Sequence, residues 1–283
     1  MTATIIDGKK LAYQKRMELK KEVESLKEKG IIPKLVIILV GNDPASISYI
    51  KGKKKASEET GVEFKLEHLE ESTSEQELLQ LIEKYNQDKE VDGILVQLPL
   101  PKHISEKAVI EKISPEKDVD GFHPINVGRM MTGQEAFLPC TPAGIVELIK
   151  SANIDLAGKH VVVVGRSNIV GKPVGQLLLN EHSTITYCHS KTKDLQSFTN
   201  QADILIVAVG KANFLSDEYI KKDAVVIDVG VNRLESGKLV GDVDFDKVKE
   251  KASYITPVPG GVGPMTITML VYNTVLSAKK RLS

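Results

Sequence analysis

Cysteine is scarce in this chain of 283 residues, in which Cys140 and Cys188 are the only two. They lie far apart and form no Cys-x-x-Cys pair, so the sequence predicts neither a disulfide framework nor a zinc site. We expect both thiols to be reduced, as in a cytosol. His, Cys and carboxylate residues show no metal-ligand spacing, and we predict no metal.

Net charge and long apolar runs are missing as well. Lys and Arg total 38 and Asp and Glu total 38, so the formal net charge is zero. This balance gives no support for a nucleic-acid or membrane-surface partner. The first residues, from Met1 to Arg16, lack a signal-peptide pattern, and no apolar run approaches the ~18 residues of a membrane span. We therefore expect a cytoplasmic protein.

Helix and strand patterns alternate along the chain, without repeats. At roughly 150 residues per domain, the length suggests two domains. Buried-strand patterns occur at residues 34–40, 62–69, 91–97, 159–164, 184–188, 203–209 and 224–229. Helix patterns occur at residues 9–29, 43–60, 74–86, 171–181, 194–200 and 265–281. Such alternation favours parallel sheets covered by helices on both faces. We predict two α/β domains with a cleft between them, lined by an irregular stretch at residues 98–142.

Local signals set some of these boundaries. Asp43 followed by Pro44 is typical of a helix start, and Gly61 of its end. Ser74 with Glu77 forms a capping box that opens the next helix.

A candidate dinucleotide-binding turn follows the strand at residues 159–164. Such a turn needs glycine, so that the backbone can approach a pyrophosphate, and helix N–H groups that point at the anion. Gly165 fits the first glycine position, Ser167 replaces the second glycine, and Gly171 comes one residue late. A strand–turn–helix without a ligand would look similar.

The residues around this turn favour NADP over NAD. An NAD site usually places an acid at the end of the second strand, whereas this chain has none between Cys188 and Asp194. Arg166, Ser190 and Lys191 could bind a 2′-phosphate through charge-assisted hydrogen bonds, although they could equally be ordinary exposed residues.

Glycines also occur in two later loops, at residues 208–214 and 228–232, the second of which contains Val231. They fit the ligand crevice at the carboxyl ends of parallel strands. Each could also be a loop glycine with a positive φ angle.

Six motifs together resemble the bacterial bifunctional methylenetetrahydrofolate dehydrogenase/methenyltetrahydrofolate cyclohydrolase family. They span nearly the whole chain in order. They are GNDPASISYIKGKKKA (41–56), DGILVQLPLP (92–101), PEKDVDGFHPINVGRM (115–130), PCTPAGI (139–145), VVVGRSNIVGKPVG (162–175) and TPVPGGVGPMT (256–266).

The resemblance implies roles for particular residues. Tyr49 would pack on the folate, Lys53 would be catalytic, Gln97 would pair with Lys53, and Asp120 would bind the pterin. Further substrate-binding residues would be Pro259, Gly260 and Gly261. The cofactor site would comprise Gly165, Arg166, Ser167, Gly171, Ser190 and Val231.

The resemblance also implies an organisation. Residues 1–140, completed by a C-terminal helix at residues 264–283, would form the N-terminal folate-binding catalytic domain. Residues 141–263 would form a C-terminal Rossmann-type domain that binds NADP. The family is commonly homodimeric.

The chemistry of these two reactions fits the residues. Removal of hydride from a methylene group between two nitrogens needs positioning rather than a base. Hydrolysis of the resulting cation needs an acid–base group, and Lys53 is the candidate. Burial and the nearby Lys51, Lys54 and Lys55 would lower its pKa. This lysine-rich run could otherwise be a solvated basic face.

The choice between Asp118 and Asp120 as the pterin-binding carboxylate is less clear, because an Asp before a glycine such as Gly121 is also common in turns. We choose Asp120 on the family match. His123 and His189 are expected to be ordinary structural histidines.

Three other interpretations stay open. The chain could be a dehydrogenase without hydrolase activity, a shikimate-dehydrogenase-like enzyme, or a non-catalytic nucleotide sensor. Lys53 favours the bifunctional enzyme over the first. The proline- and glycine-rich motifs have no place in the second.

Overall fold

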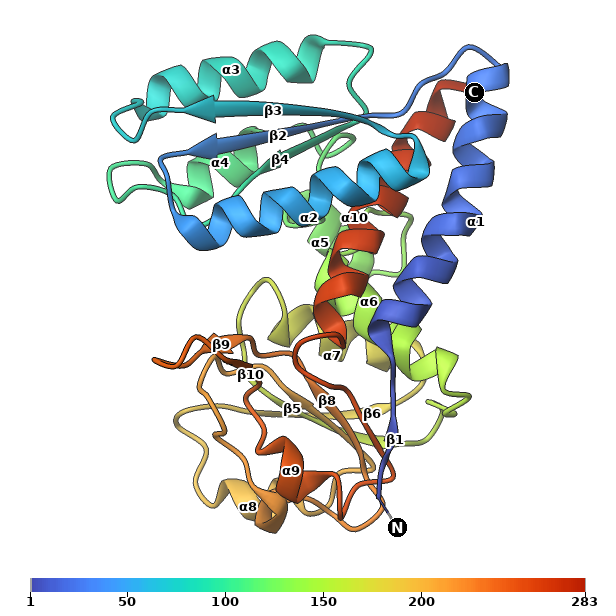
Figure 1. The fold of residues 1–283 in the computed structure, drawn as a ribbon, viewed down its shortest axis with the longest axis vertical. Helices are drawn as coiled ribbons and strands as arrows, with labels where there is room; N and C mark the ends of the chain where they lie inside the picture. The colour runs from blue at the N-terminus through green and yellow to red at the C-terminus, as the bar shows by residue number, and fades with distance from the viewer. Residues whose placement is uncertain (1, 283) are drawn as a thin grey trace. The chain divides into compact units, whose positions relative to one another are not determined.

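The computed structural model describes residues 2–282, which form two compact units (Figure 1). The six-stranded unit comprises the chain up to residue 12 together with residues 141–266. The three-stranded unit comprises residues 13–140 and the chain from residue 267 on. The sequence prediction had grouped residues 1–12 with residues 13–140. In the structure β1 (Thr4–Ile5) pairs in parallel with β11 (Tyr254–Ile255), which places this segment in the six-stranded unit.

The three-stranded unit is built on a parallel sheet of strand order β3-β2-β4. Its strands are β2 (Lys34–Val40), β3 (Glu63–Leu69) and β4 (Gly93–Val96). Its helices are most of α1 (Gly8–Glu28), α2 (Pro44–Thr60), α3 (Glu75–Gln87), α4 (Glu106–Lys112), α5 (Pro124–Met131) and the later part of α10 (Val262–Lys279), followed by the 3₁₀ turn η2 (Lys280–Leu282).

The central strand β2 explains why this sheet is covered on both faces. Val36, Ile38 and Val40 point to one side, where they pack with Leu78 and Ile82 of α3. Successive side chains alternate between the faces of a strand, so Leu35, Ile37 and Leu39 point to the other side and are also buried. Each such side chain contributes about 1.5–3 kcal/mol by leaving water.

The predicted helix boundaries around α2 and α3 are confirmed. The Asp43 carboxylate accepts a hydrogen bond from the Ser46 N–H at 2.7 Å, and Gly61 ends α2 with φ +81°. Ser74 and Glu77 form both hydrogen bonds of the capping box. The caps at Asp43 and Gly61 fix where α2, the helix that carries Tyr49 and Lys53, begins and ends.

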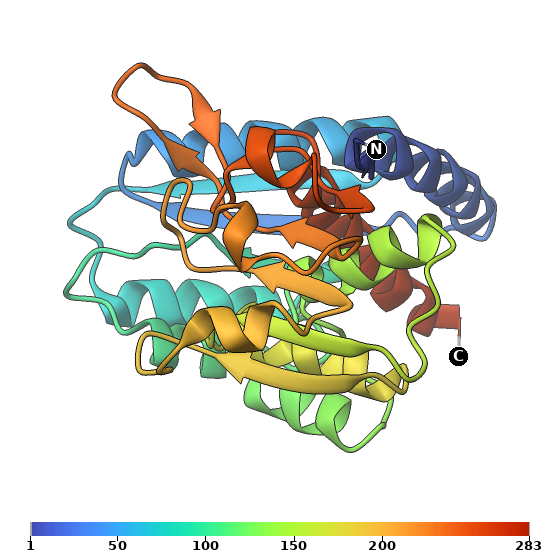
Figure 2. The same cartoon turned by 90° about the horizontal axis from the view of Figure 1, so that it is seen from below.

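The six-stranded unit has a parallel sheet of order β1-β11-β8-β7-β5-β6. The four longer strands lie side by side at one end of this order: β8 (Val225–Asp228), β7 (Ile204–Val207), β5 (His160–Val164) and the edge strand β6 (Thr184–Cys188) (Figures 1 and 2). The chain runs from β5 to β6 on one side and then to β7 on the other. This reversal is the switch point at which such sheets bind ligands.

Short elements complete this unit. Its helices are α6 (Cys140–Ser151), which begins at the unit boundary, α7 (Gly171–Asn180), α8 (Leu195–Thr199), α9 (Phe245–Val248) and the 3₁₀ turn η1 (Asp217–Tyr219). The antiparallel hairpin of β9 (Asn232–Arg233) and β10 (Leu239–Val240) projects beyond the sheet (Figure 2).

The expectation of an irregular stretch at residues 98–142 is wrong in part, because this stretch contains α4, α5 and the start of α6. Ser105 caps α4 by accepting from the Ala108 N–H, and His123 caps α5. The helices are short, and the prolines and glycines between them masked their periodicity. Within residues 2–282, no helix has the length and apolar character needed to cross a membrane.

Candidate active site

Lys53 and Gln97 are joined by a direct hydrogen bond in the three-stranded unit. Lys53 lies on α2, four residues after Tyr49, so both side chains share one face of the helix. Its Nζ donates to Gln97 Oε1 at 2.9 Å. Gln97 directly follows β4 and is 9% exposed, and its Nε2 donates to the Leu98 carbonyl at 2.7 Å. That second bond orients the amide so that its oxygen faces the lysine.

The electrostatic environment shifts Lys53 toward its neutral form. Burial lowers the pKa of Lys53, while the nearby charge of Asp120 opposes that shift. Burial likewise raises the pKa of Asp120, and the charge of Lys53 opposes it. The structure thus brings Lys53, Gln97 and Asp120 together. Tyr49 lies one turn before Lys53 and is 49% exposed.

The prediction that neighbouring lysines lower the pKa of Lys53 is wrong. Lys51, Lys54 and Lys55 are exposed, and burial is the cause that lowers the pKa of Lys53. Lys54 and Lys55 instead lie 3.8 and 3.9 Å from carboxylates one helical turn further on. Most of this lysine-rich run is therefore a solvated face, and only Lys53 turns inward.

Cys140 is a further member of this cluster that the sequence interpretation missed. It is fully buried at the start of α6, where its Sγ donates to the Val119 carbonyl at 3.3 Å and interacts with the Asp120 carboxylate. Burial raises the pKa of its thiol well above the usual value. Asn273 of α10 donates to the Val119 carbonyl at 2.9 Å and so ties the same loop. Position 140 lies within a family motif, which is the only signal that could have identified it.

Asp118, the alternative to Asp120, has a structural role. Its carboxylate accepts hydrogen bonds from the Phe122 and His123 N–H groups and from Asn126 Nδ2. Burial raises its pKa to about 6. His123 itself accepts from the Ile125 N–H through Nδ1 at 3.1 Å, so it caps α5 and is a structural histidine, as expected. These contacts hold the turn before α5.

In the six-stranded unit the turn between β5 and α7 can accept a dinucleotide. Gly165 has φ +136°, and a Cβ there would lie 2.3 Å from the Ala208 carbonyl oxygen. A Cβ at Gly171 would lie 2.6 Å from the Gly165 carbonyl oxygen. Ser167 Oγ accepts from the Val170 and Gly171 N–H groups, which shapes the turn in place of a second glycine. The close packing leaves space only for glycine at both positions.

The residues after β6 fit the 2′-phosphate of NADP. Ser190 and Lys191 are exposed there, as is Arg166 of the turn after β5. The His189 ring has a hydrogen-bond partner within the protein, since its Nδ1 accepts from the Lys191 N–H at 3.1 Å. No acid follows the strand until Asp194, so residues 189–193 themselves bring no negative charge that would repel a phosphate.

The other predicted residues also lie in the six-stranded unit. Val231 follows β8 and is 44% exposed. Pro259, Gly260 and Gly261 directly precede α10, and the Gly260 carbonyl accepts from the Lys9 N–H at 3.0 Å. Their contacts with substrate or cofactor stay predictions.

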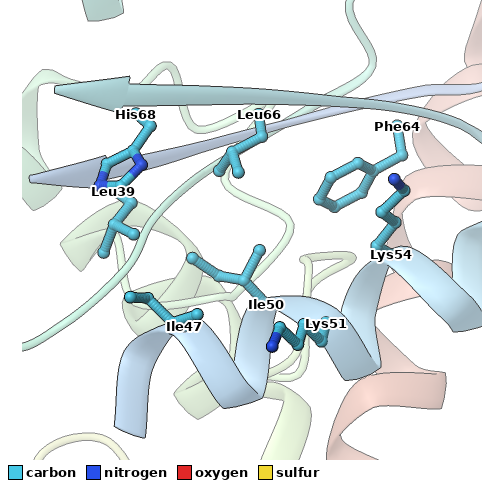
Figure 3. A pocket seen from close by; sticks show the side chains of 8 residues that line it. All are labelled: Leu39, Ile47, Ile50, Lys51, Lys54, Phe64, Leu66 and His68. Atoms are coloured by element: carbon cyan, nitrogen blue, oxygen red, sulfur yellow. The ribbon is translucent and has the colours of Figure 1, made fainter. Parts of the chain in front are cut away.

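An apolar pocket of about 360 Å³ lies on a different face of α2 from Lys53. Figure 3 shows Ile47 and Ile50 of α2 facing Phe64 and Leu66 of β3 across it. None of the predicted site residues lines this pocket, which is therefore distinct from the cluster around Lys53.

These features define an α/β enzyme with a dinucleotide-binding sheet and a separate, partly buried lysine–glutamine–carboxylate cluster. The sequence model for the catalytic domain of tetrahydrofolate dehydrogenase/cyclohydrolase matches residues 6–120, and that for its NAD(P)-binding domain matches residues 139–282. The chain belongs to the tetrahydrofolate dehydrogenase/cyclohydrolase family.

Individual members of the family match this chain over nearly its whole length. Bifunctional protein FolD of Bacillus licheniformis is 70% identical over 280 residues, which cover 99% of each chain. The crystal structure of the bifunctional FolD enzyme of Campylobacter jejuni matches with a TM-score of 0.97 at 55% identity, covering 99% of each chain. The Trypanosoma brucei FolD, solved with NADP and an inhibitor, matches with a TM-score of 0.96 at 38% identity, covering 100% of this chain and 99% of that one.

The chain resembles shikimate dehydrogenases in fold alone, and nothing else supports that alternative interpretation. Shikimate dehydrogenase of Aquifex aeolicus has a TM-score of 0.53 at 13% identity. The family instead gives this chain two activities, a dehydrogenase and a cyclohydrolase, with NADP as cofactor.

Proposed function

We propose that the three-stranded unit binds the folate and carries the reacting residues, and that the six-stranded unit binds NADP. The chain oxidises 5,10-methylenetetrahydrofolate to 5,10-methenyltetrahydrofolate and hydrolyses that product to 10-formyltetrahydrofolate. The hydrogen bond from Lys53 Nζ to Gln97, beside Asp120, is the observation that carries the assignment of residues.

For the oxidation, the protein mainly orients the substrate. NADP supplies the hydride acceptor when bound. Lone pairs on the two nitrogens beside the reacting carbon stabilise the cation that remains, so the step needs no protein base. Tyr49, exposed one turn before Lys53, packs against the folate ring system, and Asp120 accepts hydrogen bonds from the pterin. Holding the carbon in a reactive geometry accounts for the rate.

For the hydrolysis, Lys53 moves the proton. A neutral amine takes a proton from the water as its oxygen bonds to the methenyl carbon. The adduct carries a hydroxyl group on that carbon. As the bond from the carbon to N5 breaks, the lysine ammonium returns its proton to N5, the hydroxyl proton leaves to water, and the formyl group stays on N10. The lowered pKa of Lys53 makes the neutral amine accessible. Gln97 keeps the lysine pointed at the reacting carbon.

Replacement of Lys53 tests this assignment. Lys53→Met keeps an unbranched side chain up to the position of the amine but removes the amine itself, and we expect hydrolysis of methenyltetrahydrofolate to fall by about 10²–10⁴-fold. Lys51→Met, an exposed lysine on the same helix, is the matched control and should hydrolyse normally. Hydrolysis at the wild-type rate in Lys53→Met would show that this lysine is not the acid–base group.

Cofactor choice is tested at Arg166. Arg166→Ala removes an exposed cation beside the proposed 2′-phosphate site, so the KM for NADP should rise much more than the KM for NAD. Equal effects on both would contradict the 2′-phosphate role.

A further assay tests whether the protein is a catalyst at all. The protein is mixed with tetrahydrofolate, formaldehyde and NADP, and formation of NADPH excludes a non-catalytic sensor.

The proposal extends to a homodimer in the cytoplasm, as the family resemblance implies. Light scattering on the purified protein should give twice the mass of one chain. A stable monomer with both activities would contradict the dimer.

A further inference from the structure

The buried carboxylate of Asp242 holds three consecutive backbone amides of one loop. Asp242 follows the β9–β10 hairpin and is fully buried. Its Oδ2 accepts from the Val209 and Gly210 N–H groups at 2.6 and 2.9 Å. Its Oδ1 accepts from the Lys211 N–H at 2.8 Å and from Asn232 Nδ2 at 2.9 Å. Both oxygens are thus used twice, and all four donors are neutral.

These bonds join the loop after β7 to the loop after β8. Residues 209–211 lie in the loop that follows β7, and Asn232 begins β9, a few residues after β8. The packing is so close that a Cβ at Gly230 would lie 2.0 Å from Asp242 Oδ1. Asp228, the last residue of β8, accepts from the Asp242 N–H at 2.9 Å and so holds the backbone of Asp242 in place.

The two loops lie where the nicotinamide half of the cofactor must go. The sheet order β8-β7-β5-β6 arranges the carboxyl ends of these strands in a row. Ser190 follows β6 and Gly165 follows β5, so a 2′-phosphate at the first and a pyrophosphate at the second fix the direction of the dinucleotide. Its remaining half then extends over the ends of β7 and β8.

We propose that Asp242 is a positioning residue for NADP, which sets the two loops that receive the nicotinamide and its ribose. This rests on the use of NADP by the chain. Asp242 acts through the backbone of residues 209–211 and through Asn232, and has no contact of its own with the cofactor.

The Asp242→Asn variant tests the proposal, because it keeps the shape but replaces one acceptor oxygen with an NH₂ group. That group would face two N–H donors, whichever way the amide turns. We expect the dissociation constant for NADP, measured by calorimetry, to rise at least tenfold. The dissociation constant for adenosine 2′,5′-bisphosphate, which lacks the nicotinamide half, should stay within twofold of the wild-type value.

Asp203→Asn is the matched control. Asp203 also accepts from a backbone amide, the His160 N–H at 2.9 Å, but at the opposite end of the same sheet strands. It should bind both ligands as the wild type does. The milder Asn232→Ala removes one of the four donors and should weaken NADP selectively by a smaller factor.

The two-ligand comparison separates the possible outcomes. Equal weakening of NADP and adenosine 2′,5′-bisphosphate in Asp242→Asn and in Asn232→Ala would mean that the carboxylate only supports the fold, and would overturn the proposal. Unchanged NADP binding in both variants would overturn it as well. Failure of the wild type to bind either ligand would refute the cofactor site itself.

Discussion

The protonation state of Lys53 depends on two opposing influences, burial and the charge of Asp120. Burial lowers the pKa of the lysine, and the carboxylate raises it. Replacing Asp120 with Asn removes only the second influence, so the pKa of Lys53 should fall further. The neutral base is present above its pKa. The acid limb of the pH profile for hydrolysis, measured as kcat at saturating substrate, should therefore move to lower pH.

The Asp118→Asn variant is the control for this shift. Asp118 is also buried, but it holds the turn before α5 and is not among the groups that shift Lys53. Its replacement should lower stability and leave the acid limb in place. If Asp120→Asn left the limb in place as well, the coupling between Asp120 and Lys53 would be wrong.

At single residues, the sequence could identify side chains but not their surroundings. Lys53, Gln97 and Asp120 were predicted from motifs, and the structure gathers them in one cluster. Cys140 was considered only for disulfides and zinc. Its partners Val119 and Asn273 come from distant parts of the chain, and no local pattern records such contacts.

Among the elements, α2 matters most because it carries Tyr49 and Lys53. Its first turn depends on the bond from the Ser46 N–H to Asp43. Asp43→Ala should lower the free energy of unfolding by about 1 kcal/mol, as loss of an N-cap does. Fraying of that turn should also slow hydrolysis several-fold, as measured with methenyltetrahydrofolate at saturation.

Ser74→Ala provides the comparison within the same unit. It removes the cap of α3, which carries no proposed site residue, and should cost a similar free energy of unfolding. Urea unfolding and hydrolysis are measured on both variants. Hydrolysis that falls equally in both would mean that general stability, rather than the start of α2, limits the activity.

Elements were predictable where the pattern was long and bounded by a cap. The strand at residues 34–40 and the helix after Asp43 have their expected ends, because apolar runs and capping contacts are local. Strands β1 and β11 were missed because two residues are too few for any periodicity. They form through pairing with each other and, for β11, with β8.

For the whole molecule, the sequence predicted two α/β domains but not the path of the chain through them. The order β1-β11-β8-β7-β5-β6 brings the first strand beside the last one. Nothing in the segment around Thr4 indicates this partner, because parallel pairing depends on strands that are 250 residues further along. The cleft between the units stays a prediction.

The end of the chain also closes the three-stranded unit, through an ion pair to a buried carboxylate. Arg281 Nη2 lies 2.9 Å from Asp92 Oδ2 and donates to the Ile32 carbonyl at the same distance. Burial raises the pKa of Asp92 to about 6, and the charge of Arg281 opposes this rise. Since the folded-state pKa exceeds the unfolded-state value of about 3.9, stability from Asp92 falls as the pH rises from about 4 to about 6.

Replacement of Arg281 with Ala should therefore destabilise the protein more at pH 8 than at pH 5. At pH 5 Asp92 is mostly protonated in the fold and needs the cation little. At pH 8 the wild-type carboxylate is ionised and paired, whereas the variant must bury it unpaired or protonate it. We expect a loss of about 1.5–3 kcal/mol at pH 8, the usual contribution of a hydrogen bond to a charged group. Urea unfolding of both proteins at the two pH values measures this, and an equal loss at both would show that Arg281 acts through packing alone.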